Sequence, residues 1–121
     1  MKNNKYTNTI ETLKNDLEDG LLFCDIWSKE TGLSLGGFNE NAKYSALFGK
    51  ITKNIEKALH DLGLPKFGKY EIIDLEADTI LFIINLDEKH LLGGLADKNI
   101  VNLGILLNFA VPNAIETFNK Q

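Results

Sequence analysis

The sequence predicts a mixed α/β domain in which a five-stranded antiparallel sheet is sandwiched between helices, in the order α-β-β-α-β-β-β-α. One long segment repeats its apolar residues at a helical period, whereas several short apolar segments are separated by tight turns. The 121 residues are enough for a single domain, which we expect to span residues 1–121. With 44% apolar and 25% charged residues, the composition excludes a disordered chain, a collagen and a coiled coil.

The N-terminal half is predicted to contain a helix, a β-hairpin and a longer helix. Asn8 and Glu11 have the spacing of a capping box, and apolar residues at helical spacing follow to about residue 19. Residues 21–27 and 33–38 are apolar runs joined by a turn, so they should pair as a hairpin. A helix is predicted over residues 41–62. Its apolar face, which we expect to pack on the sheet, holds Tyr44, Leu47, Phe48, Ile51, Ile55, Ala58, Leu59 and Leu62.

The C-terminal half is predicted to form three strands and a last helix. The strands cover about residues 69–75, 79–86 and 90–96, and their short connections favour an antiparallel meander. The second of these strands is apolar on both faces, which is typical of a central strand. The helix should run over residues 99–118, and Pro112 should kink or split it because proline lacks a backbone donor.

Charge narrows the classes of partner. The net charge is −4 and all 13 basic residues are lysines, so no arginine is present. Proteins that bind nucleic acid usually present a basic surface. Because the net charge of this chain is negative, we do not expect nucleic-acid binding. An arginine finger for phosphoryl transfer cannot come from this chain.

Cysteine usage and hydropathy indicate the compartment. Cys24 is the single cysteine, which excludes an internal disulfide and suits a reducing cytoplasm. The polar N-terminus lacks the features of a signal peptide, and the longest apolar run, residues 80–84, is too short to span a membrane. We therefore expect a cytoplasmic protein without membrane insertion, bound cofactor or metal.

Two segments resemble ligand-binding loops without meeting their requirements. Residues 63–70 nearly match a phosphate-binding P-loop, but Tyr70 stands where a serine or threonine must bind magnesium, and no helix follows. Residues 74–85 begin like an EF-hand loop, but Thr79 replaces the glycine and Asn85 replaces the final glutamate. A solvated hairpin turn is the interpretation we favour for the second segment.

Cys24, Asp25 and the glycines inside strands each have a structural interpretation beside a functional one. Nothing in the spacing brings Cys24 to His60 or His90, so a packed core thiol is favoured over a catalytic one. Asp25 lies within an apolar strand, either buried with a partner or on a poorly covered face. The glycine pairs 36–37 and 93–94 lie inside strands, where tight packing is favoured over a ligand slot.

The long helix carries two distinct flanks beside its apolar face. A small-residue flank holds Ala42, Ser45, Gly49 and Thr52, and a lysine flank holds Lys43, Lys50, Lys53 and Lys57. A glycine inside an exposed helix costs about 1 kcal/mol relative to alanine. Close approach of a second helix would explain Gly49, so the small-residue flank is predicted to form an interface.

The order of the elements and two segments resemble the roadblock/dynein light-chain family, which has a profilin-like fold. Residues 25–37, DIWSKETGLSLGG, resemble that family's strand-turn-glycine-strand opening. The three-strand meander and the following residues 102–106, NLGIL, resemble its closing strands and helix. The resemblance covers about residues 8–118.

The resemblance implies a homodimer and a class of partner. In the family the long helix and the first strand of the meander pair with their mates across a two-fold axis, which here adds Tyr70 and Ile72 to the predicted interface. Members are scaffolds and regulators of small Ras-like GTPases, or subunits of motor and signalling assemblies, and bacterial members regulate a polarity or gliding GTPase. The lysine flank would face an acidic partner surface.

The sequence therefore predicts a non-enzymatic dimeric adaptor of roadblock type that binds a small GTPase. A small-molecule sensor is the alternative, because sensor folds share an antiparallel sheet with helices. A roomy pocket at the glycine pairs would favour the sensor. An enzyme ranks third, since no convergent set of catalytic groups is visible.

Overall fold

The computed structural model describes residues 4–120 and contains one antiparallel sheet with the strand order β2-β1-β5-β4-β3. Its strands are β1 (Leu21–Ser28), β2 (Ser34–Phe38), β3 (Tyr70–Leu75), β4 (Thr79–Asn85) and β5 (His90–Asp97). The predicted fold class, the first hairpin and the meander are confirmed.

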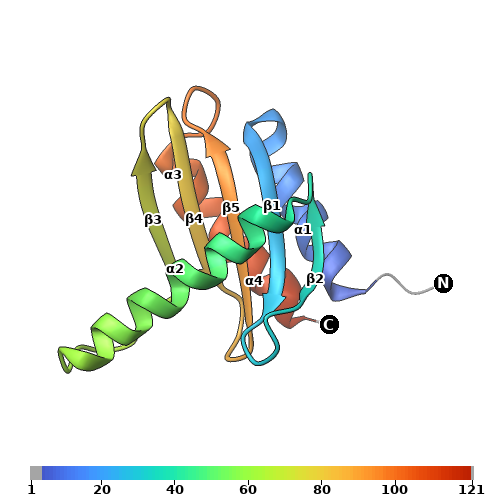
Figure 1. Ribbon diagram of the computed structural model, residues 1–121. Coiled ribbons are helices and arrows are strands. Elements are labelled where there is room, and N and C mark those ends of the chain that lie inside the picture. The colour runs from blue at the N-terminus through green and yellow to red at the C-terminus, as the bar shows by residue number, and fades with distance from the viewer. Residues whose placement is uncertain (1–3, 121) are drawn as a thin grey trace.

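Helices cover both faces of this sheet. The elements are α1 (Lys5–Leu17), a 3₁₀ turn (Glu18–Gly20), α2 (Ala42–Asp61), α3 (Leu103–Ile105), a π-helical turn (Leu106–Ala110) and α4 (Val111–Asn119). In Figure 1, α2 crosses one face diagonally, whereas α1, α3 and α4 lie behind the opposite face. The sandwich therefore has a single long helix on one side, and that side is the less covered one.

The first helix begins earlier than the sequence predicts. Asn4 caps α1 by accepting a hydrogen bond from the Thr7 backbone N–H at 2.7 Å. The Asn8 N–H already donates to the Asn4 carbonyl oxygen, so Asn8 lies inside the helix and the predicted capping box with Glu11 is wrong. An asparagine at either position satisfies the free N–H groups of a first turn, and the pattern alone does not separate them.

The last helix begins later than predicted and is interrupted as predicted. Residues 97–101 form a turn, and the Asn102 side chain caps α3 by accepting from the Ile105 N–H at 2.8 Å. The chain then passes through a π-helical turn before Pro112, which lies at the start of α4. Proline is tolerated there because the first helical N–H groups need no partner within the helix.

Two apolar cores flank the sheet. The larger lies between the sheet and helices α1 and α4, and the smaller lies under α2 around Phe23, Trp27, Phe48 and Ile83. The central part of β4, Ile80 to Ile84, is buried throughout, which confirms the prediction of a strand covered on both faces.

The predicted sheet-facing stripe of α2 is only partly correct. Phe48 is buried, but Tyr44, Leu47 and Leu62 are exposed, Leu47 by 50%. Because α2 crosses the sheet diagonally and its C-terminal turns extend past the β3 edge in Figure 1, only a short part of the stripe meets the strands. The helical period predicts which residues share a face, but the crossing direction decides which of them are covered.

Glycines in β5 allow α2 to pack closely on the sheet. A Cβ at Gly93 would lie 2.7 Å from Phe48 Cδ1 and 2.9 Å from Trp27 Cζ3. A Cβ at Gly94 would lie 2.3 Å from Phe82 Cζ on the opposite face. Tight packing, favoured from the sequence for this glycine pair, is confirmed.

We predict opposite effects for two glycine-to-alanine substitutions. Gly93→Ala should destabilise the fold by about 1–3 kcal/mol, because the new methyl group overpacks the contact with Phe48. Gly49→Ala should stabilise it by about 0.5–1 kcal/mol, since it lies inside α2 with no atom within 4 Å of the new Cβ. Urea denaturation measures both. A Gly93→Ala variant as stable as the wild type would contradict the packing argument.

Candidate functional site in a groove beside helix α2

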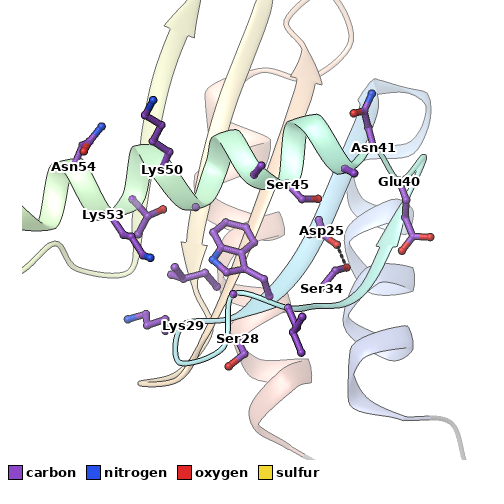
Figure 2. A pocket seen from close by; sticks show the side chains of 18 of the residues that line it. Asp25, Ser28, Lys29, Ser34, Glu40, Asn41, Ser45, Lys50, Lys53 and Asn54 are labelled. Atoms are coloured by element: carbon purple, nitrogen blue, oxygen red, sulfur yellow. Dashed lines mark hydrogen bonds between the residues drawn. The ribbon is translucent and has the colours of Figure 1, made fainter.

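A groove runs between α2 and the β1–β2 hairpin, on the less covered side of the sheet. Its volume is about 810 Å³, and Figure 2 shows its side chains. One wall is the flank of α2 that carries Ala42, Ser45 and Gly49. The floor and the other wall come from β1 and the hairpin.

Short side chains on both walls keep the groove open. Gly49 meets no heavy atom within 4 Å of the position that its Cβ would take. In β2, Gly37 pairs with Asp25 and Ser34 pairs with Trp27, so the residues of β2 on the α2 side are small. Longer side chains at Ser34 and Gly49, which line the groove, would fill the space between α2 and the hairpin.

Asp25 lies at the base of the groove. Its exposed fraction is 1%, and its Oδ1 accepts a 2.5 Å hydrogen bond from the Ser34 hydroxyl. Its Oδ2 is buried and has no hydrogen-bond partner among residues 4–120. The question that the sequence left open is thus answered, because Asp25 is buried and only one of its two oxygens is satisfied.

The surroundings of Asp25 disfavour its charged form. Burial raises the pKa of the Asp25 carboxyl, the Ser34 and Ser45 hydroxyls partly offset this rise, and the Glu40 carboxylate adds to it. No cation among residues 4–120 is a cause of the shift in this pKa. A buried carboxylate in this setting is stabilised best by a hydrogen-bond donor or a positive charge from outside.

The groove is electrically divided along its length. In Figure 2, Asp25 lies near Ser34, Ser45 and Glu40, toward the N-terminal end of α2. Lys29 and Lys53 line the other end in Figure 2, whereas Lys50 extends from the far side of α2. Glu56, one turn after Lys53, is also a lining residue. Trp27 and Leu91 add apolar surface to the lining. The groove therefore offers an acidic end, a basic end and an apolar wall.

The residues predicted for a dimer interface do not lie together. Ala42, Ser45 and Gly49 line the groove, whereas Thr52 is only 3% exposed and donates its hydroxyl to the Phe48 carbonyl oxygen. Thr52 therefore faces the sheet, and its prediction as a helix–helix contact is wrong. The contact through the other three stays a prediction.

The remaining predicted interface residues lie on the edge strand β3. Tyr70 is exposed at the start of β3, and Ile72 packs toward the core on the α1 and α4 side. In the sheet order, β3 is bonded to β4 alone among the described strands. These two residues thus lie at an unpaired edge, as the predicted pairing requires.

The predicted partner-binding lysines are all exposed along α2. Lys50 and Lys53 line the groove, whereas Lys43 and Lys57 are outside its lining. Lys57 pairs with Asp61 at 2.5 Å. The lysine flank is thus a solvent-facing surface, of which one part borders the groove.

Cys24 and both histidines lie outside the groove lining. Cys24 is fully buried, and burial raises the pKa of its thiol to about 12, so it is a packed core thiol as the sequence favoured. Within residues 4–120, no group of three or more histidine, cysteine, aspartate or glutamate side chains could hold a metal ion. No helix in this part of the chain is long and apolar enough to cross a membrane.

Sequence reasoning missed the groove itself, and with it Ser34 and Trp27 as lining residues. Asp25 within an apolar strand was the available signal, but its meaning depends on which β2 residues lie opposite it. That register, with Gly37 across from Asp25, comes from the folded hairpin. Small residues on this face of a short β2 allow the groove to reach the buried acid.

No protein-family model matches the sequence, and no curated protein is similar to it in sequence. Solved structures are similar to it along nearly the whole chain. Myxococcus xanthus MglB has 14% identity and a TM-score of 0.80, covering 99% of this chain and 96% of that one. The gliding protein MglB from Thermus thermophilus has 16% identity and a TM-score of 0.75, covering 99% and 92%.

A roadblock/LC7 domain from Streptomyces avermitilis has 13% identity and a TM-score of 0.72, covering 92% of this chain and 94% of that one. The chain has the roadblock fold. At these identities the likeness establishes the fold, which confirms the architecture that the sequence resemblance implied. What the surfaces of this fold bind is inferred from this chain's own residues.

We predict that Asp25→Asn makes the fold more stable at neutral pH. The raised pKa of Asp25 means that the folded state favours the protonated form. The stability linked to this group is therefore fully present below the unfolded-state pKa and is lost as the pH rises through the folded-state pKa. Asparagine removes the buried charge, so its advantage in melting temperature should be present at pH 7 and shrink toward about pH 4.

Asp19→Asn is the matched control, because Asp19 is exposed and its neutralisation should change stability by less than about 0.5 kcal/mol. Thermal unfolding at several pH values measures both variants. An Asp25→Asn variant less stable than the wild type at pH 7 would show that the ionised carboxylate is well accommodated.

Proposed function

We propose that this protein is a non-enzymatic dimeric adaptor that binds and regulates a small Ras-like GTPase. The observation that carries the proposal is an apolar surface on α2 and β3 in which Tyr44, Leu47 and Leu75 are exposed. The likeness to MglB, one structure of which is described as a gliding protein, supports the class of function. The burial of Cys24 and the position of both histidines outside the groove lining support a non-enzymatic role.

The apolar surface lies on the flank of α2 opposite the groove. At 100° per residue, Tyr44, Leu47 and Ile51 fall on the side away from Gly49. Next to them on the same side of the sheet are Ile73 and Leu75 of β3, half-buried and exposed respectively. We call these five residues the α2–β3 surface. A patch of this kind marks an interaction site in a folded protein.

The edge of β3 favours a second copy of this chain as the occupant. Tyr70–Leu75 has one bonded neighbour among the described strands, β4, so one row of its backbone groups is available to pair with another strand. Two copies related by a two-fold axis would join their β3 strands and place their α2–β3 surfaces against each other. A structure described as MglB with tetrameric arrangement, with 16% identity and a TM-score of 0.74, supports assembly by this fold.

Two substitutions, one on each flank of α2, distinguish a dimer through the α2–β3 surface from a dimer through the small-residue flank. Leu47→Lys should weaken a dimer built on the α2–β3 surface by about 100-fold, because two leucines of roughly 1.5 kcal/mol each lose their burial. Gly49→Leu should leave that dimer intact. Light scattering over a dilution series measures both.

The opposite result would place the dimer contact on the other flank of α2. A dimer that survives Leu47→Lys but dissociates with Gly49→Leu would place the contact on the small-residue flank, as the sequence predicted. A wild type that is monomeric at all concentrations would exclude both arrangements.

The lysine flank is the surface we propose for the GTPase. Lys43, Lys50, Lys53 and Lys57 are exposed along α2, and a dimer presents each of them twice. An acidic partner surface would be steered to this flank, with association rates that fall as salt rises. Single rim charges contribute only a few tenths of a kcal/mol, so a single substitution is a weak test.

We predict that the double change Lys43→Glu and Lys57→Glu weakens GTPase binding about tenfold and removes most of its salt dependence. These lysines lie outside the groove, so the groove stays unaltered. The partner is isolated from native lysate with GDP or a non-hydrolysable GTP analogue, and its affinity for wild type and variant is then measured with purified proteins.

A double variant that remains dimeric and binds with unchanged affinity and salt dependence would exclude the lysine flank. Failure to isolate any small GTPase in either nucleotide state would count against the proposed function itself.

A small-molecule sensor is the second candidate, and the groove is the observation that favours it. The groove lies beside α2 and not at the glycine pairs, because none of Gly36, Gly37, Gly93 and Gly94 is among its lining residues. The sensor and the adaptor are compatible, since the groove and the α2–β3 surface lie on opposite flanks of α2.

A further inference from the structure

We infer that the groove beside α2 is a binding site for a small linear molecule with a positive charge at one end and a negative charge at the other. Asp25 would receive the cationic group, and Lys29 and Lys53 would receive the anionic group. The inference concerns this chain's own groove and does not depend on the identity of a GTPase.

The acidic end needs a partner that the described residues do not provide. Asp25 is only 1% exposed, and its Oδ2 has no hydrogen bond within residues 4–120. The Ser34 hydroxyl donates to the other oxygen, Oδ1. An unsatisfied buried acceptor is costly, and a charged one more so. An ammonium group supplies both the donor and the charge that this oxygen lacks.

The groove reaches Asp25, which is one of its lining residues. On the β2 side the packing is close, because a Cβ at Gly37 would lie 2.7 Å from the Cys24 carbonyl oxygen and 3.1 Å from Asp25 Oδ1, so the cationic group must approach from the groove. Ser45 of α2 faces the same end of the groove in Figure 2 and offers a hydroxyl as a further acceptor. Glu40 adds a second negative charge nearby. This end of the groove therefore selects for a cation.

The basic end is available to bind an anion. Lys29 and Lys53 form no ion pair with any carboxylate among residues 4–120, including Glu56 of the groove lining. Lys29 instead lies over the Phe67 ring, with its Nζ 5.9 Å from the ring centroid. Two ammonium groups without a carboxylate partner outnumber Glu56 at this end of the groove and attract a carboxylate or a phosphate.

The dimensions set the length of the ligand. Ser45 and Lys53 are separated by eight residues of α2, which corresponds to about 12 Å along the helix axis. An extended peptide covers about 3.5 Å per residue, so a tripeptide covers about 10.5 Å of this distance, and the long Lys53 side chain reaches over the rest. The volume of about 810 Å³ lies within the range of small-molecule sites. Trp27 and Leu91 provide the apolar wall for the body of the ligand.

Trp27 also makes the site measurable, because it is the only tryptophan in the chain and lines the groove. The probes are Gly-Gly-Gly, its N-acetyl form without the cation, and its C-terminal amide without the anion. We expect Gly-Gly-Gly to give a saturable change in Trp27 fluorescence and a rise in melting temperature, with a Kd below about 1 mM. Each blocked form should bind at least about tenfold more weakly.

Three variants assign the binding to the groove. Asp25→Asn should weaken Gly-Gly-Gly binding at least about tenfold and abolish the preference over the N-acetyl form. Gly49→Leu should fill the groove and block all three probes. Lys57→Gln, outside the groove lining, is the control and should bind like the wild type. Circular dichroism confirms that each variant is folded.

The outcomes separate this inference from the proposed function. Absence of any saturable signal with Gly-Gly-Gly, or equal binding by the N-acetyl form, overturns the inference and leaves the dimer and the GTPase untouched. Unchanged binding by the Asp25→Asn variant overturns the assignment of the cationic end. Binding that persists in the Leu47→Lys variant supports the inference and shows that the groove acts without the dimer.

Discussion

The contact between Phe48 of α2 and the glycine backbone of β5 determines the position of every surface described above. Gly93 has no side chain, so the Phe48 ring lies directly against the sheet and stacks on Phe23, with ring centroids 5.7 Å apart. Phe48 and the buried Thr52 hold the helix close to the sheet, which it crosses diagonally (Figure 1). On one flank the crossing leaves the groove above β1 and β2, and on the other it leaves apolar residues beside β3.

The two faces of the sheet therefore contribute differently to stability. The side with α1 and α4 holds the larger core, with Leu13, Phe82 and Phe118 fully buried, and supplies most of the burial that stabilises the fold. The α2 side buries few side chains of the helix, and Thr52 and Phe48 are the buried members of α2. Substitutions on the exposed parts of α2 therefore cost little stability. Surface chemistry can vary there without loss of the fold.

Local patterns predicted most of the elements, whereas long-range geometry decided the site. The strands and the body of α2 follow from apolar periodicity, which adjacent residues carry. The exposure of Leu47 could not be inferred from that period, because it depends on the direction in which α2 crosses the sheet. The environment of Asp25 depends on Gly37, which is paired with it across the hairpin. For the same reason the fold was recognisable from sequence but the groove was not.

Asp25 lowers the stability of the fold, and its position at the base of the groove points to a function. A buried carboxylate with one unsatisfied oxygen opposes folding, and an apolar or amide side chain in the same space would be better tolerated. Natural domains keep such groups mainly where function needs them, at the expense of stability. Because the acid lies under Ser45 on one flank of α2 while Leu47 lies on the other, a ligand in the groove and a second copy on the α2–β3 surface would touch the same helix. Any shift of α2 on the sheet changes both surfaces together, which is the physical basis for coupling between them.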